Sequence, residues 1–109
     1  MLTNRSKIET FIGFSIKARA LITGTNSIGT LKKAYLVLLC DTASDNAKKI
    51  AQSYSNKFGC PLMICKIPLE QLTGKENCKM AAITDVNLAK AVLDNQDGNF
   101  SVSSGGNGL

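Results

Sequence analysis

The sequence predicts an α/β domain, a layered sandwich of helices on a largely parallel sheet. Two observations lead to this fold class. Four short apolar runs, ALIT, YLVLLC, PLMICKI and KMAAIT, alternate along the chain with segments whose apolar residues recur at helical spacing. The run YLVLLC contains no alternating polar residues. It therefore predicts a strand covered on both faces, as central strands of α/β sheets are.

The first two helices are indicated by spacing and by capping residues. One is expected over residues 4–18, with the inward face Ile8, Phe11, Ile12 and Ile16. The segment SDNAKKIAQSYSNKFG, residues 44–59, predicts an amphipathic helix of about four turns. Ser44 can cap its amino terminus, and Gly59 followed by Pro61 would end it.

The second half of the chain predicts two shorter helices and a tail. Pro68 can open a helical turn over residues 69–72. A last helix is expected over residues 86–94, with Asp85 as its N-cap. Its inward side chains would be Val86, Ala89, Val92 and Leu93. Residues 96–109 are rich in Gly, Ser and Asn, and we interpret them as a flexible C-terminal tail after a single domain, residues 1–95.

Composition agrees with one cytoplasmic domain. A chain of 109 residues with 44% hydrophobic and 19% charged residues can bury one core. No apolar run approaches the ~18–20 residues that a membrane helix needs, and the start of the chain lacks the basic-then-apolar order of a signal peptide. We therefore expect no membrane partner.

The chemistry-bearing residues do not indicate an enzyme. The chain contains no histidine, and its cysteines are Cys40, Cys60, Cys65 and Cys78. None of their spacings is the close pair of a structural zinc site, so reduced thiols acting as small hydrophobes are expected. Without histidine, no Ser/His or Cys/His pair can form. We expect no catalysis, no metal and no cofactor.

The net charge of +5 is unevenly distributed. Residues 1–33 contain six of the 13 basic residues and one of the eight acidic ones, and the remaining residues are balanced. This clustering favours a polyanionic partner, but a basic excess also occurs as a simple solubility feature.

The segment GTNSIG, residues 24–29, resembles a phosphate-binding loop only in part. A P-loop continues its second glycine with lysine, which is missing here, so nucleotide hydrolysis is not favoured. The pattern predicts a strand ending at Thr23, then Gly24, then a short helix opened by Thr25, Asn26 and Ser27. Free amides and the Asn26 side chain can hold a phosphate or a base edge, but Asn26 or Ser27 can equally be a simple N-cap.

Taken together, the motifs resemble a known family. In order, KARALITGTN, YLVLLCDTASDNAKKI, the Gly-Cys-Pro turn, LEQL, GKE and AAITDVNLAKA are similar to the landmarks of the kink-turn-binding ribosomal proteins. These are the ribosomal seven-Ae, thirty-e and S-twelve-e proteins and small bacterial homologues of the YlxQ type. The resemblance covers residues 5–94. It implies a three-layer α/β/α sandwich with a four-stranded mixed sheet, and binding to RNA kink-turns, which bend a stem sharply beside sheared G·A pairs.

The resemblance also implies which residues would contact RNA. Gly24, Thr25 and Asn26 match the family's glycine-started loop, in which the Asn reads a guanine edge. Ser27 stands where the family usually has Glu, and Thr30 where it usually has Lys. The segment from Gly24 to YLVLLC is also a few residues shorter than usual.

A second RNA-contacting segment is implied further along. LEQLTGKE corresponds to a longer family loop that packs against an extruded nucleotide, and it matches that loop at Leu72, Gly74 and Lys75. Phosphates would be neutralised by Arg19, Lys32, Lys33 and Lys75. We therefore expect a monomeric, ribosome-associated protein that binds structured RNA. The departures leave open a protein-interaction module on the same scaffold, and a nucleotide or metabolite binder is a third possibility.

Overall fold

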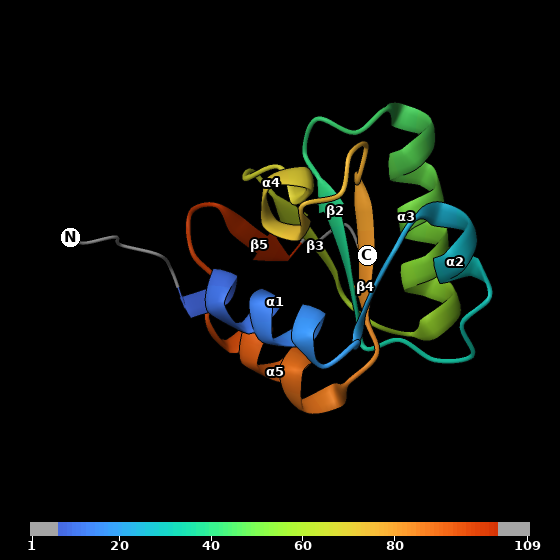
Figure 1. The fold of residues 1–109 in the computed structure, drawn as a ribbon. Helices are drawn as coiled ribbons and strands as arrows, with labels where there is room; N and C mark the ends of the chain where they lie inside the picture. The colour runs from blue at the N-terminus through green and yellow to red at the C-terminus, as the bar shows by residue number, and fades with distance from the viewer. Residues whose placement is uncertain (1–6, 103–109) are drawn as a thin grey trace.

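Helices and strands alternate along the chain in the computed structural model, which describes residues 7–102 (Figure 1). The elements are α1 (Lys7–Lys17), β1 (Leu21–Thr23), α2 (Thr25–Gly29), β2 (Leu36–Cys40), α3 (Asp45–Phe58), β3 (Leu62–Cys65), α4 (Leu69–Thr73), β4 (Met80–Ile83), α5 (Val86–Asp94) and β5 (Phe100–Val102). The α/β class expected from the sequence is confirmed. None of the helices within residues 7–102 combines the length and apolar character needed to cross a bilayer.

The sheet is mixed and has five strands in the order β1-β4-β2-β3-β5. Only β2 and β3 pair in parallel, because β4 lies between β1 and β2 and runs against both. The expectation of a largely parallel sheet is therefore wrong, and so is the count of four strands. An apolar run reveals burial on both faces but not strand direction, so the insertion of β4 leaves no signal in the pattern.

The fifth strand comes from the segment predicted to be a flexible tail. β5 pairs antiparallel with β3, and its Phe100 is fully buried. The carboxylate of Asp97 accepts hydrogen bonds from the Asn99 and Phe100 amides at 2.8 and 3.1 Å, which forms the turn before the strand. Residues 96–102 thus belong to the domain, which corrects both the tail and the boundary at residue 95. Residues 103–109 lie outside the described range.

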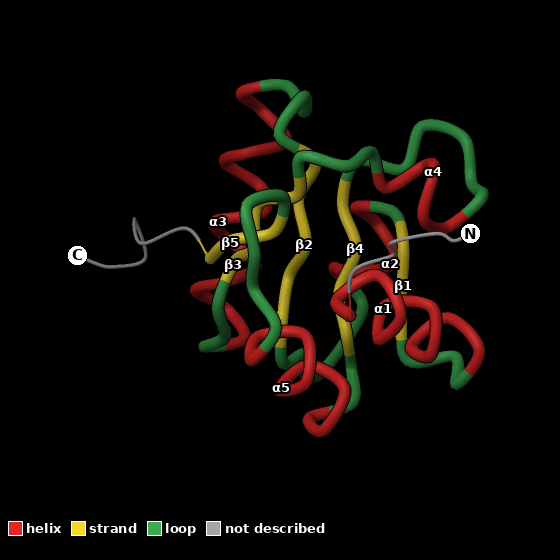
Figure 2. Tube along the Cα trace, turned by 90° about the vertical axis from the view of Figure 1, so that its left-hand side faces the viewer, coloured by secondary structure: helices red, strands yellow, loops and turns green. Residues whose placement is uncertain are grey.

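Helices cover both faces of the sheet, as Figures 1 and 2 show. One apolar cluster joins α1, α4 and α5 to one face, and a second joins α2 and α3 to the other. The first cluster is centred on the fully buried residues Ile8, Ile12, Leu36, Leu38, Met63, Ile83 and Phe100. The second is centred on Ile28, Val37, Leu39, Ala51 and Ala82.

The predicted helix caps are confirmed. The Ser44 hydroxyl accepts a hydrogen bond from the Ala47 amide at 3.1 Å, and Gly59 ends α3 in the left-handed conformation. Asp85 caps α5 through the amides of Asn87 and Leu88.

Two side chains that the sequence predicts to face inward, those of Ile16 and Val86, are exposed instead. Ile16 is 36% exposed, because the inward line of α1 continues from Ile12 to the buried Ser15, whose hydroxyl donates to the Phe11 carbonyl. Val86 is 53% exposed, since it is the first residue of α5. Residues 4–6 of the predicted first helix lie outside the described range.

The strand directions define two edges of the sheet. Because β1, β2 and β3 run the same way, Thr23, Cys40 and Cys65 end at one edge, which we call the carboxyl edge. Leu21, Leu36 and the loops before them lie at the opposite edge, which we call the amino edge.

Candidate nucleic-acid interface

The strand-to-helix corner formed by residues 23–27, which we call the Gly24 corner, has the geometry predicted from the sequence. β1 ends at Thr23, and Gly24 adopts φ 93° before α2 begins at Thr25. A positive φ of this size favours glycine over any residue with a Cβ. A Cβ placed there would meet no atom within 4 Å, so the backbone is open to close approach.

Asn26 and Ser27 are exposed and do not cap the helix. Gly24 occupies the N-cap position of α2, and no side-chain cap bond is formed there. The interpretation of Asn26 or Ser27 as the N-cap is therefore wrong. Within residues 7–102, one side chain forms a hydrogen bond with Ser27: the Thr30 hydroxyl donates to the Ser27 carbonyl at 2.7 Å. The Asn26 side chain is exposed and forms no hydrogen bond with another residue in the range 7–102, so it is available to a ligand.

Helix α3 fixes both ends of α2. The Tyr54 hydroxyl donates to the Thr25 carbonyl at 2.8 Å, and the Lys57 ammonium donates to the Gly29 carbonyl at 3.1 Å. A Cβ at Gly29 would lie 2.7 Å from the Tyr54 oxygen, so glycine is needed for this contact. A helix of five residues has little stability alone, and these contacts hold it in place.

The loop between α4 and β4, residues 74–79, brings Lys75 to the Gly24 corner. The Lys75 ammonium donates to the Thr23 hydroxyl at 3.3 Å, although the two residues are 52 positions apart. Gly74 ends α4 with φ 74°, and the Thr73 hydroxyl accepts from the Lys75 amide at 3.2 Å. The two segments implied by the family resemblance therefore meet at this edge through Thr23 and Lys75.

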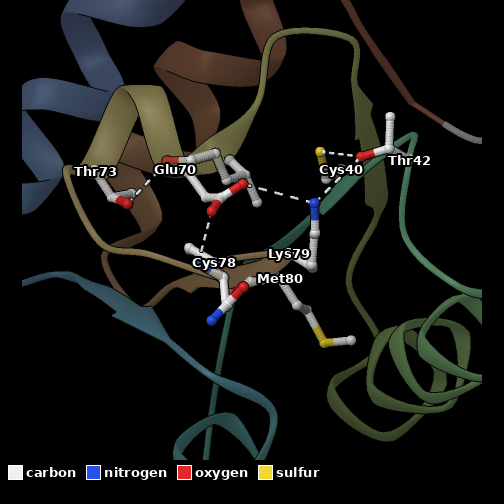
Figure 3. A network of polar contacts seen from close by, with 9 residues as sticks. Cys40, Thr42, Glu70, Thr73, Cys78, Lys79 and Met80 are labelled. Carbon is white, nitrogen blue, oxygen red and sulfur yellow. Dashed lines mark hydrogen bonds and ion pairs between the residues drawn. The ribbon is translucent and has the colours of Figure 1, made fainter.

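A polar network that sequence reasoning missed supports this loop (Figure 3). The Glu70 carboxylate accepts from the Asn77 amide at 2.7 Å and pairs with the Lys79 ammonium at 3.6 Å. Lys79 also donates to the Thr42 hydroxyl at 3.5 Å, which links the loop to the end of β2. The only available signal is the pair of lysines in GKENCK, the second of which, Lys79, is also the first residue of the run KMAAIT. Asn77 has φ 59°, a left-handed conformation that Asn tolerates better than most residues.

Four other predicted residues do not join the Gly24 corner. Arg19 lies in the turn before β1, and Lys32 and Lys33 lie in the loop before β2, so all three belong to the amino edge. Leu72 packs into the apolar cluster beneath α1. Because the loops that precede parallel strands gather at one edge and those that follow them at the other, one compact site cannot include both sets.

The cysteines are free thiols, of which Cys40, Cys65 and Cys78 are buried and Cys60 is half-buried. Burial raises the pKa of Cys65 to about 12 and that of Cys60 to about 11, and it also raises the pKa of Cys78. At Cys40 burial acts to raise the pKa, but hydrogen bonds with Thr42 and the Leu69 amide, together with the charge of Lys79, lower it overall. Among residues 7–102, no group of three or more His, Cys, Asp or Glu residues could hold a metal ion.

A small cavity lies between α1 and α4. It is lined by Glu9, Gly13, Gln71 and Leu72 and has a volume of about 200 Å³. Small-molecule sites usually have volumes of roughly 300–1,000 Å³. The cavity is therefore small for a cofactor.

Comparison with known proteins shows the fold but not the family. Neither a protein-family model nor a curated protein matches the sequence. The solved structure of a protein of unknown function from Bacillus halodurans is similar, with a TM-score of 0.69 and 19% sequence identity. The similarity covers 81% of this chain and 94% of that one. At this level of identity, only a shared fold follows.

Proposed function

We propose that this protein binds structured RNA of the kink-turn type, without catalysis, through the Gly24 corner and the α4–β4 loop. In this proposal the fold is the three-layer α/β/α sandwich of the kink-turn-binding ribosomal proteins, and the protein is a cytoplasmic, ribosome-associated monomer. Its partner is RNA, and it uses neither a metal nor a cofactor.

The observation that carries the proposal is the contact between Lys75 and Thr23. It joins the two segments that the resemblance assigns to RNA. A cation, an open glycine backbone and an exposed amide side chain then lie at a single edge. Asn26 can pair with a base edge, Gly24 allows the backbone to approach, and Lys75 can contact a phosphate.

Lys79 adds a second cation to this interface in the proposal. The Lys79 ammonium is 3.6 Å from the Glu70 carboxylate, and the side chains are 42% and 38% exposed, respectively. An ion pair at this exposure is weak, so a phosphate can compete with Glu70 for the lysine. Thr30 stands where the family usually has lysine, and in this proposal Lys79 of the α4–β4 loop supplies a cation in its place.

A protein-interaction module is the second candidate function. Phe14 is 49% exposed and Ile16 36% exposed on α1, and Val86 is 53% exposed on α5. α1 packs against α5, so these apolar side chains lie on one helical layer of the fold (Figure 2). Exposed apolar side chains mark a protein contact where they form a contiguous patch, and this layer is the place where such a patch could form.

Titration with two RNAs separates the candidates. One is a kink-turn RNA and the other a plain duplex of equal length, both measured over several salt concentrations. The RNA proposal predicts tighter binding to the kink-turn and loss of that preference in Asn26→Ala. Asn46→Ala, which removes an exposed amide side chain from α3, is the matched control and should keep it. Absence of RNA binding at low salt would refute the proposal and favour the protein-interaction module.

A further inference from the structure

The positive charge of this protein is concentrated at the amino edge, away from the Gly24 corner. The loops at this edge carry Arg19, Lys32 and Lys33, and the last turn of α1 adds Lys17. The only acid in these loops is Asp85, and one oxygen of its carboxylate accepts the two amide hydrogen bonds that cap α5. At the carboxyl edge, in contrast, the loops and α4 hold three lysines and four acids: Lys66, Lys75, Lys79, Asp41, Glu70, Glu76 and Asp97.

The four amino-edge cations are available to a ligand. All are exposed, and none forms an ion pair with another residue in the range 7–102. Lys33 lies over the Tyr35 ring, with its ammonium 5.6 Å from the ring centre, and this aromatic contact leaves its hydrogen-bond donors available. Lys57 at the end of α3 is different, because its ammonium already donates to the Gly29 carbonyl.

Loops from separate strands bring these cations onto one edge. Leu21 of β1 and Leu36 of β2 both align with Ile83 of β4, which lies between the two strands. β1 and β2 therefore begin at the same level of the sheet, and Arg19 and Lys33 lie in the loops directly before these two strands. The charge of Lys33 also acts on Cys60 in the turn before β3, where it opposes the effect of burial on the thiol pKa. The cations are thus distributed along the amino edge and do not form one compact cluster.

Arg19 occupies its position at a conformational cost. Its φ of 59° is left-handed, directly after the end of α1, where glycine is the usual residue. An arginine there contributes no capping advantage over glycine, but it places a guanidinium at the edge.

We infer that the amino edge is a second RNA-binding surface, which takes the phosphate backbone of a duplex by charge and without reading its sequence. The Gly24 corner follows β1, which has three residues, and a strand rises ~3.3 Å per residue, so β1 separates the corner from the amino edge by about 10 Å along the strand. One RNA can therefore place a kink at the corner and a flanking stem along the amino edge. The inference rests on the proposed RNA binding, but it does not require kink recognition.

The test measures binding of a plain RNA duplex as a function of salt. log K decreases as log salt increases, and the magnitude of this slope falls by ~0.7–0.9 for each phosphate contact that is lost. Arg19→Gly should lower the slope by about 1, and Lys32→Gln with Lys33→Gln by about 2. The matched control, Lys48→Gln with Lys49→Gln, removes two exposed charges near the amino terminus of α3, which lies away from the amino edge of the sheet, and should leave the slope unchanged.

Arg19→Gly separates binding from folding. Glycine relieves the left-handed conformation, so the variant should melt at an unchanged or higher temperature while it binds the duplex more weakly. Equal slopes for the edge variants and the control would overturn the inference and leave the Gly24 proposal intact. Absence of binding to either RNA at low salt would refute both. Loss of binding to phosphatidylserine vesicles in the edge variants, with duplex binding unchanged, would identify a membrane surface instead and overturn the inference.

Discussion

Replacing Gly29 by alanine tests the contact that fixes α2 on α3. A Cβ at Gly29 would lie 2.7 Å from the Tyr54 hydroxyl oxygen and 3.5 Å from the carbon that bears it. Two non-bonded heavy atoms do not approach so closely, and the tyrosine ring must move. The hydrogen bond of 2.8 Å from its hydroxyl to the Thr25 carbonyl is then lost.

The expected change in stability has three parts. Loss of the hydrogen bond lowers the free energy of unfolding by about 0.5–1.5 kcal/mol. Displacement of the ring lowers it by about 1–3 kcal/mol, as overpacking does elsewhere. Alanine restores up to about 1 kcal/mol through its higher helix propensity. This gain applies because Gly29 has an ordinary backbone conformation with no positive φ. The net loss should be about 0.5–4.5 kcal/mol.

Urea denaturation of four proteins isolates this contact. Gly29→Ala is compared in the Tyr54 background and in the Tyr54→Phe background, which lacks the clashing oxygen. In the Tyr54→Phe background the alanine should be neutral or stabilise by up to about 1 kcal/mol, so the two substitutions should not be additive. An equal loss of stability in both backgrounds would refute the reasoning.

Three further predictions follow from the geometry. Gly24→Ala should destabilise by about 1–2 kcal/mol in urea denaturation through backbone strain alone, because φ 93° with ψ 135° is a conformation that only glycine adopts readily; equal stability of the two proteins would contradict this. Phe100→Ala should lower the free energy of unfolding by about 3–5 kcal/mol, whereas a change below about 1 kcal/mol would mean that β5 contributes little to the core. The free energy of unfolding should decrease as pH rises from 9 toward 12, because the thiols of the unfolded chain lose their protons near pH 9 whereas burial in the folded protein raises the pKa of Cys60 to about 11 and that of Cys65 to about 12. Cys65→Ala should show a shallower decrease with pH. An unchanged pH profile in this variant would count against the effect of burial.

The sequence predicts the local structure of this protein better than its topology. Ser44, Gly59 and Asp85 are end signals that act within a few residues, and each one caps its helix as expected. The Gly24 corner is also local, because a strand, a glycine and small polar residues define it. Strand order depends on contacts between distant residues, which is why the apolar runs do not place β4 between β1 and β2.

The wrong predictions have different physical causes. Phe100 is a single aromatic in a Gly- and Asn-rich segment, so its strand of three residues has no periodic pattern to detect. Ile16 and Val86 lie at helix ends, where the apolar residues still follow the helical spacing but no neighbouring element covers them. For the proposed site, the sequence and its family resemblance predicted Gly24, Asn26 and Lys75, and the segments that carry them meet through the contact between Lys75 and Thr23. It could not show that Arg19, Lys32 and Lys33 lie at the opposite edge, because that depends on strand direction.

The most direct test of RNA recognition at the Gly24 corner is a backbone NMR titration of the ¹⁵N-labelled protein with a kink-turn RNA. We predict the largest shift changes in the amides of Gly24 to Ser27 and of Lys75, which lie on neighbouring segments. Amides of the amino edge would respond to a plain duplex as well. Changes confined to α1 and α5, around Phe14 and Val86, or no changes at low salt, would contradict the account.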